Sequence, residues 1–327
     1  MRTVSHLVQN GDGWLLSLVQ SWDPATLDPS RRPVLIVPGY GMNSFIFGYH
    51  PSGASLEVFL VAHGFEVWRV DLRASGSSIR RGGGEGFSLE DLALTDLTVA
   101  IDAALDRTRT QCSRVDVIGA SLGGTLMFIH AVAKANHKLG AMVSMGSPVR
   151  WVEAHPLVKM LFASPMLVGL VPVRGTRWAA ELALPLLAKH TPSLLGIYLN
   201  PAATDVAAAR EMVRTVEDPN RFINRQIARW IRDRDLVVHG INVSEALGRI
   251  TLPTLCVAAN GDGIVPLATA QFPYERVSSS EKGLLIVGDD ELSMAHADLF
   301  VANQAHETVF RPIADWLARQ STAAASA

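Results

Sequence analysis

Ser121 lies at the centre of the pentapeptide GASLG, residues 119–123. The β-rich run 115–118 precedes it and an apolar, helix-like segment follows it, so the pattern predicts a strand, a sharp turn and a helix. Glycines two residues before and two residues after the serine leave room for the crowded backbone of such a turn. The pattern therefore predicts a nucleophilic serine held above the carboxyl end of a sheet.

A serine hydroxyl needs a base within hydrogen-bond reach and a carboxylate that fixes the tautomer of that base. Asp262 follows the apolar run 254–259, and His296 lies in the loop after the run 283–287. The order Ser121, Asp262, His296 is typical of one arrangement of catalytic triads. Asp262 is also a normal choice for a turn and His296 for a loop. The reserve base is His306, and the reserve acids are Asp289, Asp290 and Glu291.

The chain has 327 residues, of which 48% are hydrophobic and 18% are charged, with a formal net charge of -2. This length suits one large α/β core that carries an insertion. Because the net charge is small, neither nucleic acid nor an anionic membrane is expected as a partner. The two cysteines, Cys112 and Cys256, are far apart and predict no disulfide framework and no zinc site. No metal or organic cofactor is implied.

Strand and helix patterns alternate along most of the chain, which predicts a mostly parallel sheet of about eight strands flanked by helices. An Asn10-Gly11 turn predicts an opening β-hairpin, and Ser88 with Asp91 resembles a capping box. A final helix is expected over 311–319, followed by a frayed tail over 321–327. Asp71 and Arg73 are expected to brace a loop by an ion pair.

The segment 148–248 has no clear strand pattern and is rich in alanine- and leucine-containing helical runs broken by prolines. It predicts a helical cap inserted between two parts of one core, residues 1–147 and 249–327. The apolar stretch 156–172 is too short to span a bilayer. Its residues 158–171 are expected to wall an acyl pocket, although ordinary packing would also explain their composition. Residues 1–6 are not followed by the apolar run of a secretory signal, so a cytoplasmic location is expected.

Arginines at positions 221, 225, 229 and 232 fall at helical spacing, opposite an apolar face formed by Ile223, Ile227, Trp230 and Ile231. Such a basic amphipathic helix could contact an anionic lipid or acyl-carrier surface. The favoured interpretation is an ordinary cap helix with a solvated arginine face, because its apolar side is needed to cover the core.

Several sequence motifs together resemble the α/β-hydrolase superfamily, and most of all its acid lipase branch, the gastric and lysosomal lipases. They are Asp12-Gly13, Pro38-Gly39-Tyr40-Gly41, Ser55-Leu56, the stretch His63 to Trp68, the GASLG pentapeptide, Asp262, and His296-Ala297-Asp298-Leu299-Phe300. Acid lipases usually have His-Gly where this chain has Pro38-Gly39. A weaker similarity links Ile250 to Leu255 and Asp262 to Pro266 with polyhydroxyalkanoate synthases, which use cysteine where Ser121 stands.

The resemblance implies a serine hydrolase that cleaves carboxylic esters, and the apolar composition of the cap predicts hydrophobic acyl or alkyl groups in the substrate. Ser121 would be the nucleophile, His296 the base and Asp262 the orienting acid, and the backbone N–H groups of Leu122 and Tyr40 would form an oxyanion hole. Acyl transfer, or cleavage of a C–C, amide or carbamate bond, is an alternative for the same residues. A second alternative is a ligand-binding protein of the same fold without catalytic activity. A weak contact of the cap with a lipid surface is also left open, as is the oligomeric state.

Overall fold

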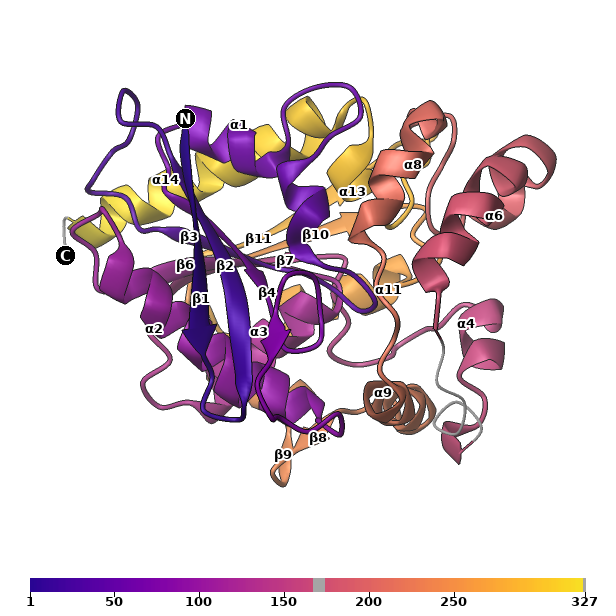
Figure 1. Ribbon diagram of the computed structural model, residues 1–327, viewed down its shortest axis with the longest axis horizontal. Coiled ribbons are helices and arrows are strands. Elements are labelled where there is room, and N and C mark those ends of the chain that lie inside the picture. Colours follow the sequence, from indigo (N-terminus) through magenta and orange to yellow (C-terminus); the bar gives the residue numbers. More distant parts are fainter. Residues whose placement is uncertain (167–173, 326–327) are drawn as a thin grey trace.

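A nine-stranded sheet forms the centre of the protein in the computed structural model, which describes residues 1–166 and 174–325. The strand order is β1-β2-β4-β3-β6-β7-β10-β11, and β5 pairs with β2 beside this path (Figure 1). The strands are β1 (Arg2–Gln9), β2 (Trp14–Trp22), β3 (Val34–Val37), β4 (Val67–Asp71), β5 (Ile79–Arg80), β6 (Val115–Ala120), β7 (Leu139–Met145), β10 (Thr254–Ala259) and β11 (Lys282–Val287).

The six strands from β4 to β11 in this order run parallel to one another, whereas β1 and β2 form an antiparallel hairpin and β2 is antiparallel to β4. The predictions of an opening hairpin and of a mostly parallel sheet are confirmed. Strands β3, β6, β7 and β10 are entirely buried, which explains their unbroken apolar runs. Parallel pairing brings the ends of β6, β7 and β10 to one edge of the sheet.

Helices cover both faces of the sheet. On one face lie α2 (Leu97–Arg107), α3 (Leu122–Ala133), α10 (Val243–Ala246) and α12 (Phe272–Arg276), and on the other lie α1 (Leu56–Ala62), α13 (Asp298–Val301) and α14 (Arg311–Ala325) (Figure 1). Strand β3 serves both layers, because Leu35 and Val37 pack in the first and Val34 and Ile36 in the second. Shorter helical segments are η1 (Ser44–Gly48), η2 (Asp91–Asp96), η5 (Leu247–Arg249), α11 (Leu267–Ala270) and η6 (His306–Phe310).

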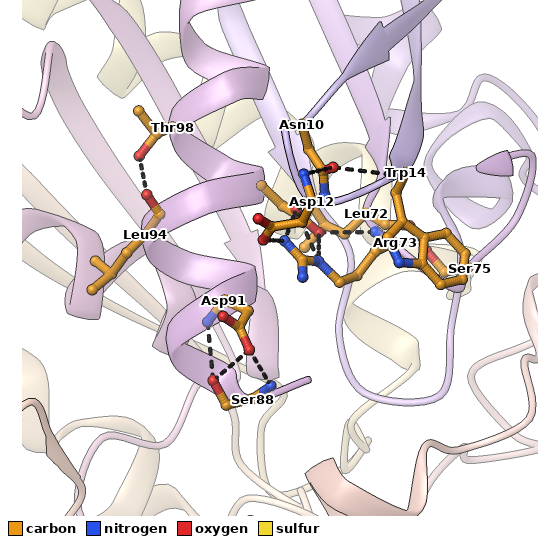
Figure 2. A network of polar contacts seen from close by, with 11 residues as sticks. Asn10, Asp12, Trp14, Leu72, Arg73, Ser75, Ser88, Asp91, Leu94 and Thr98 are labelled. Carbon is orange, nitrogen blue, oxygen red and sulfur yellow. Dashed lines mark hydrogen bonds and ion pairs between the residues drawn. The ribbon is translucent and has the colours of Figure 1, made fainter. Parts of the chain in front are cut away.

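A partly buried polar network ties the first hairpin turn to the loop after β4 (Figure 2). The guanidinium of Arg73 binds Asp96 at 2.7 Å and Asp12 at 2.8 Å, and Asn10 donates to Asp96. The expected pair of Arg73 with Asp71 is therefore wrong. The carboxylate of Asp71 instead accepts from the amides of Ser44 and Ser77, because it lies at the strand end where those amides converge.

The capping box at the start of the next helix is confirmed. The Asp91 carboxylate accepts from the Ser88 amide, and the Asp91 amide donates to the Ser88 hydroxyl (Figure 2). The reciprocal bonds satisfy two amides that have no partner within the helix. At the other end of the chain, α14 continues to Ala325, beyond the end at residue 319 that the sequence predicts.

The segment between β7 and β10 that we call the inserted segment (residues 148–248) is mainly helical and ends with α10 and most of η5. It contains α4 (Pro156–Leu161), α6 (Thr176–His190), α7 (Pro192–Leu195), η3 (Val206–Ala208), α8 (Ala209–Met212), η4 (Val213–Thr215) and α9 (Arg221–Asp233). A two-stranded hairpin of β8 (Val237–Val238) and β9 (Ile241–Asn242) was not predicted, because two-residue strands leave little pattern in a sequence. Figure 1 shows α4, α6 and α9 together at one end of the sheet.

The helices of this segment differ in how they pack. Helix α9 buries Ile223, Ile227 and Trp230 against the layer of α2 and α3, as its apolar face predicts. Helices α4 and α6 have no buried residue. Of the predicted acyl-pocket wall over 158–171, the part from residue 167 lies outside the described residues. Within the described part of the chain, no helix is both long and apolar enough to cross a bilayer.

Candidate active site

Ser121 occupies a strained turn between β6 and α3. Its backbone has φ 51° and ψ -121°, in a region that side-chain-bearing residues rarely adopt. A Cβ on Gly119 would overlap the backbone of Gly124, and one on Gly123 would overlap the carbonyl of Val37. The two glycines are therefore required by close backbone approach, as the pentapeptide spacing predicts.

The end of β7 connects this turn to the other candidate residues. The Ser121 amide donates to the carbonyl of Met145 at 2.8 Å. The next residue, Gly146, lies directly against the other two side chains: a Cβ there would be 3.1 Å from His296 Cε1 and 3.3 Å from Asp262 Oδ2. The backbone of Met145 and Gly146 therefore connects Ser121 with the contact between His296 and Asp262.

Asp262 is held in the turn after β10 by its own loop. Its Oδ1 accepts from the amides of Ile264 and Val265, each at 2.8 Å, and its Oδ2 lies 2.6 Å from His296 Nδ1. The turn-forming role that aspartate commonly plays and the contact with histidine therefore coexist in one side chain, one oxygen for each. Two backbone amides and the His296 ring therefore surround this buried carboxylate and fix its orientation.

His296 lies in the loop before α13 and is 6% exposed. Its Nδ1 is engaged by Asp262, so Nε2 is the nitrogen directed away from the carboxylate. The ring of Tyr198, from the inserted segment, lies with its centroid 6.3 Å from that of His296. Sequence reasoning did not assign Tyr198 to the site, since an isolated tyrosine in a helical segment carries no local signal.

The reserve candidates lie elsewhere. His306 Nε2 is 2.7 Å from the Ala54 carbonyl, and its ring packs on His50, 4.4 Å between centroids, beneath α1. Asp289 accepts from the amides of Glu291 and Leu292 in an exposed turn. Asp290 and Glu291 are exposed in the same turn. None of these four residues lines the cavity described next.

A cavity of about 220 Å³ lies above Ser121. Ser121, Leu122, Tyr40 and His296 line it together with apolar side chains of the core and of the inserted segment, among them Trp151, Val158, Phe162, Ile227, Trp230 and Phe300. Trp151 and Trp230 meet edge to face with centroids 5.6 Å apart. Among the described lining residues none is an aspartate, glutamate, lysine or arginine, so the cavity suits an uncharged, apolar group.

Tyr40 connects the loop after β3 to the inserted segment. Its hydroxyl donates to Oδ1 of buried Asn224 in α9 at 2.5 Å, and its ring meets Phe162 edge to face. Burial raises the pKa of the Tyr40 phenol, so this group stays a donor near neutral pH. The same loop packs on the serine, because a Cβ on Gly39 would lie 2.9 Å from Ser121 Cβ. No local pattern in the sequence predicts the contact between Tyr40 and Asn224.

Residues 28–288 match the family model described as serine aminopeptidase, S33. This match covers most of the chain, and together with the sheet topology it confirms the α/β-hydrolase fold predicted from the sequence. The chain belongs to the serine aminopeptidase S33 family. The narrower resemblances to acid lipases and to polyhydroxyalkanoate synthases are not confirmed by this match.

Solved structures with similar folds include hydrolases. An esterase from Exiguobacterium antarcticum has a TM-score of 0.60 and 16% identity over 96% of this chain and 100% of its own. A thermophilic esterase from Thermogutta terrifontis has a TM-score of 0.62 and 18% identity over 98% and 100%. A meta-cleavage product hydrolase from Pseudomonas fluorescens has a TM-score of 0.60 and 14% identity over 97% of both chains. At these identities the likeness concerns the fold. No curated protein sequence matches the chain.

Proposed function

We propose that this protein is a serine hydrolase that cleaves carboxylic esters with hydrophobic acyl or alkyl groups. One observation carries the proposal: Ser121 and His296 line the same apolar cavity, and His296 Nδ1 lies 2.6 Å from Oδ2 of buried Asp262. A base held in one tautomer by a carboxylate, next to a serine in a strained turn, is the arrangement that activates a hydroxyl.

In the proposed reaction, Ser121 Oγ attacks the ester carbonyl carbon while His296 Nε2 accepts the hydroxyl proton. The tetrahedral intermediate collapses, the C–O bond to the alcohol breaks, and the imidazolium returns the proton to the leaving oxygen. Water then attacks the acyl-serine, again giving a proton to His296, and the carboxylic acid leaves as Ser121 regains its proton. Asp262 holds the imidazole and stabilises its charged form throughout.

The negative oxygen of the intermediate would be held by the backbone N–H groups of Leu122 and Tyr40. Leu122 is the first residue of α3, so its amide belongs to the positive end of the helix dipole. Tyr40 lies in the loop that packs against Ser121. Each such donor contributes about 3 to 4 kcal/mol to transition-state stabilisation.

The lining of the cavity favours esters over peptides with a free amino terminus. An aminopeptidase needs a carboxylate or similar acceptor for the substrate ammonium group, because an unpaired charge in an apolar pocket is costly. The described lining residues include none. We therefore propose an ester substrate although the family is named for aminopeptidase activity.

The inserted segment would act as a cap, with residues 1–147 and 249–327 as the core. Val158, Phe162, Ile227 and Trp230 of this segment line the cavity, which supports that role. The proposed weak contact with a lipid surface would involve α4 and α6 rather than the arginine face of α9. Met160, Leu161, Trp178 and Leu186 are each at least 60% exposed there, and α9 buries its apolar side.

The proposal is tested with an alkyl fluorophosphonate, which reacts with activated serines, and with p-nitrophenyl acetate, butyrate and octanoate. We expect the adduct on the peptide containing Ser121 and hydrolysis that favours the apolar acyl chains. The Ser121→Ala variant should fold, stay unlabelled and lose activity by several orders of magnitude, whereas Ser280→Ala, which changes an exposed serine, should behave as the wild type. A folded wild-type protein that is neither labelled nor active would favour a ligand-binding role.

The same groups could also transfer the acyl group to an alcohol, amine or thiol, or cleave a C–C bond. Product analysis in the presence of competing acceptors separates hydrolysis from transfer. Hydrolysis of aminoacyl p-nitroanilides faster than of the matching apolar esters would contradict the preference argued from the cavity.

A further inference from the structure

A short strap of the inserted segment, residues 197–204, is hydrogen-bonded to the loops that carry both Asp262 and His296. The Ile197 carbonyl accepts from the Gly263 amide at 3.0 Å, next to Asp262. The Tyr198 carbonyl accepts from the Ala297 amide at 2.8 Å, next to His296. The inserted segment is therefore bonded to the backbone one residue away from each of the two side chains.

Asp298 is the centre of this connection on the histidine side. Its side chain is fully buried at the start of α13. One carboxylate oxygen accepts from the Ala295 amide at 2.7 Å, and the Asp298 amide donates to the Ala295 carbonyl at 3.2 Å. His296 thus lies inside a turn closed by two hydrogen bonds between its neighbours.

The same carboxylate also holds the strap. It accepts from the Thr204 hydroxyl at 2.7 Å and from the Asn200 amide at 3.0 Å, while the Asn200 side chain donates to the Ser293 carbonyl at 2.6 Å. Two donors come from the strap and one from the histidine turn. A single carboxylate therefore fixes the position of the turn relative to the inserted segment.

The buried carboxylate of Asp298 is stabilised by these hydrogen-bond donors. Burial raises the pKa of Asp298 to about 6, opposed by the hydrogen bonds from Ala295, Thr204 and Asn200. Near pH 8 the group is ionised, and a buried carboxylate that loses a donor is left poorly solvated. Separating the histidine turn from the strap would therefore leave the Asp298 carboxylate without its donors from the strap, and this cost holds the two segments together.

We infer that Asp298 is a positioning residue, which clamps the histidine turn to the strap and so fixes the direction in which His296 faces Ser121. The inference rests on the proposed function, because it concerns the base of that reaction. A displacement of about 1 Å in a reacting group can lower a rate by about 100-fold. Loosening the clamp should therefore reduce turnover without removing any group that touches the substrate.

The decisive variant is Thr204→Val, which removes one donor to Asp298 on the strap side and keeps the size of a buried side chain. Thr204→Ser keeps the hydroxyl. Thr269→Val is the matched control, because Thr269 is also fully buried. The Thr269 hydroxyl also joins the core to the inserted segment, since it donates to the Glu153 carbonyl, and it lies away from the histidine turn. Asp298→Asn is the second variant, which removes the charge itself.

Each variant is assayed with p-nitrophenyl butyrate at pH 8, with kcat expressed per serine that a fluorophosphonate titrates, so that unfolded protein does not count. We expect Thr204→Val to lower kcat about 10-fold and Asp298→Asn about 10- to 100-fold, both with KM within about twofold. Thr204→Ser and Thr269→Val should retain the wild-type kcat.

Equal kcat in wild type, Thr204→Val and Asp298→Asn would overturn the clamp while leaving the proposed function intact. An equal loss in Thr269→Val would also overturn it, because general loosening of the inserted segment would then explain the effect. A folded wild-type protein with neither labelling nor hydrolysis would overturn the proposed function and the clamp with it.

Discussion

Replacing Tyr40 with phenylalanine would leave a buried acceptor without its donor. The Tyr40 hydroxyl lies 2.5 Å from Oδ1 of Asn224, which is 2% exposed in α9. Phenylalanine keeps the ring and its edge-to-face contact with Phe162. The substitution therefore isolates one hydrogen bond between the loop after β3 and the inserted segment.

The expected cost follows from that geometry. A buried polar atom left unpaired costs about 1 to 3 kcal/mol, and the enclosed position of Asn224 places the estimate near 2 kcal/mol. Asn224→Leu has a similar side-chain size, and combining it with Tyr40→Phe replaces both polar partners with apolar groups. The double variant should be more stable than the sum of the single losses predicts, by about 1 to 2 kcal/mol.

The assay is equilibrium unfolding in urea for the wild type, the two single variants and the double variant. Tyr49→Phe is a matched control, since the Tyr49 ring stacks on Phe45 with centroids 5.3 Å apart and this contact survives the change. Strictly additive losses in the double variant would refute the reasoning. So would a Tyr40→Phe protein as stable as the control.

Three further outcomes are expected. Asp262→Asn should lower kcat/KM for p-nitrophenyl butyrate by a factor on the order of 10⁴, because the amide favours the wrong imidazole tautomer. The control Asp289→Asn, in the exposed turn, should match the wild type. Equal losses of kcat/KM in the two variants would contradict the assignment of Asp262. Burial and the charge of His306 lower the pKa of His50 to about 4 from 6.5, so protonation favours the unfolded chain. The contribution of His50 to the free energy of unfolding should be complete above pH 6.5. It should fall by at most about 1.4 kcal/mol per pH unit as the pH is lowered towards 4. Urea unfolding from pH 7 to 5 should show a shallower decline in His50→Gln, and parallel curves would refute the role. Trp178→Glu should reduce sedimentation with phosphatidylglycerol vesicles and leave hydrolysis of soluble esters unchanged, and undiminished sedimentation would exclude α6 from the lipid contact.

Local patterns in the sequence predicted the parts of the fold that depend on neighbouring residues. Gly119 and Gly123 are fixed by backbone crowding within a few positions of Ser121, and the capping box joins residues three apart. The unbroken apolar runs predicted the buried parallel strands because burial on both faces excludes polar side chains. These features need no knowledge of how distant segments meet.

Contacts between distant residues could not be predicted in the same way. Tyr40 and Asn224 are 184 positions apart, and Thr204 and Asp298 are 94 apart. The sequence contains many polar residues that could form these hydrogen bonds, and which of them lie within reach depends on the fold. The error at Arg73 has this origin, because Asp71 is nearer in sequence while Asp96 lies beside the guanidinium in space.

The backbone of Ser121, with φ 51° and ψ -121°, makes this position one where activity and stability favour different residues. Such a conformation costs a residue with a side chain about 1 to 3 kcal/mol, whereas glycine adopts it without a Cβ clash. A Ser121→Gly protein should thus withstand more denaturant than the native chain, even after the extra entropy that glycine gains on unfolding. Laboratory selection for resistance to heat alone would favour discarding the nucleophile, so stability screens of this protein need a simultaneous demand for turnover.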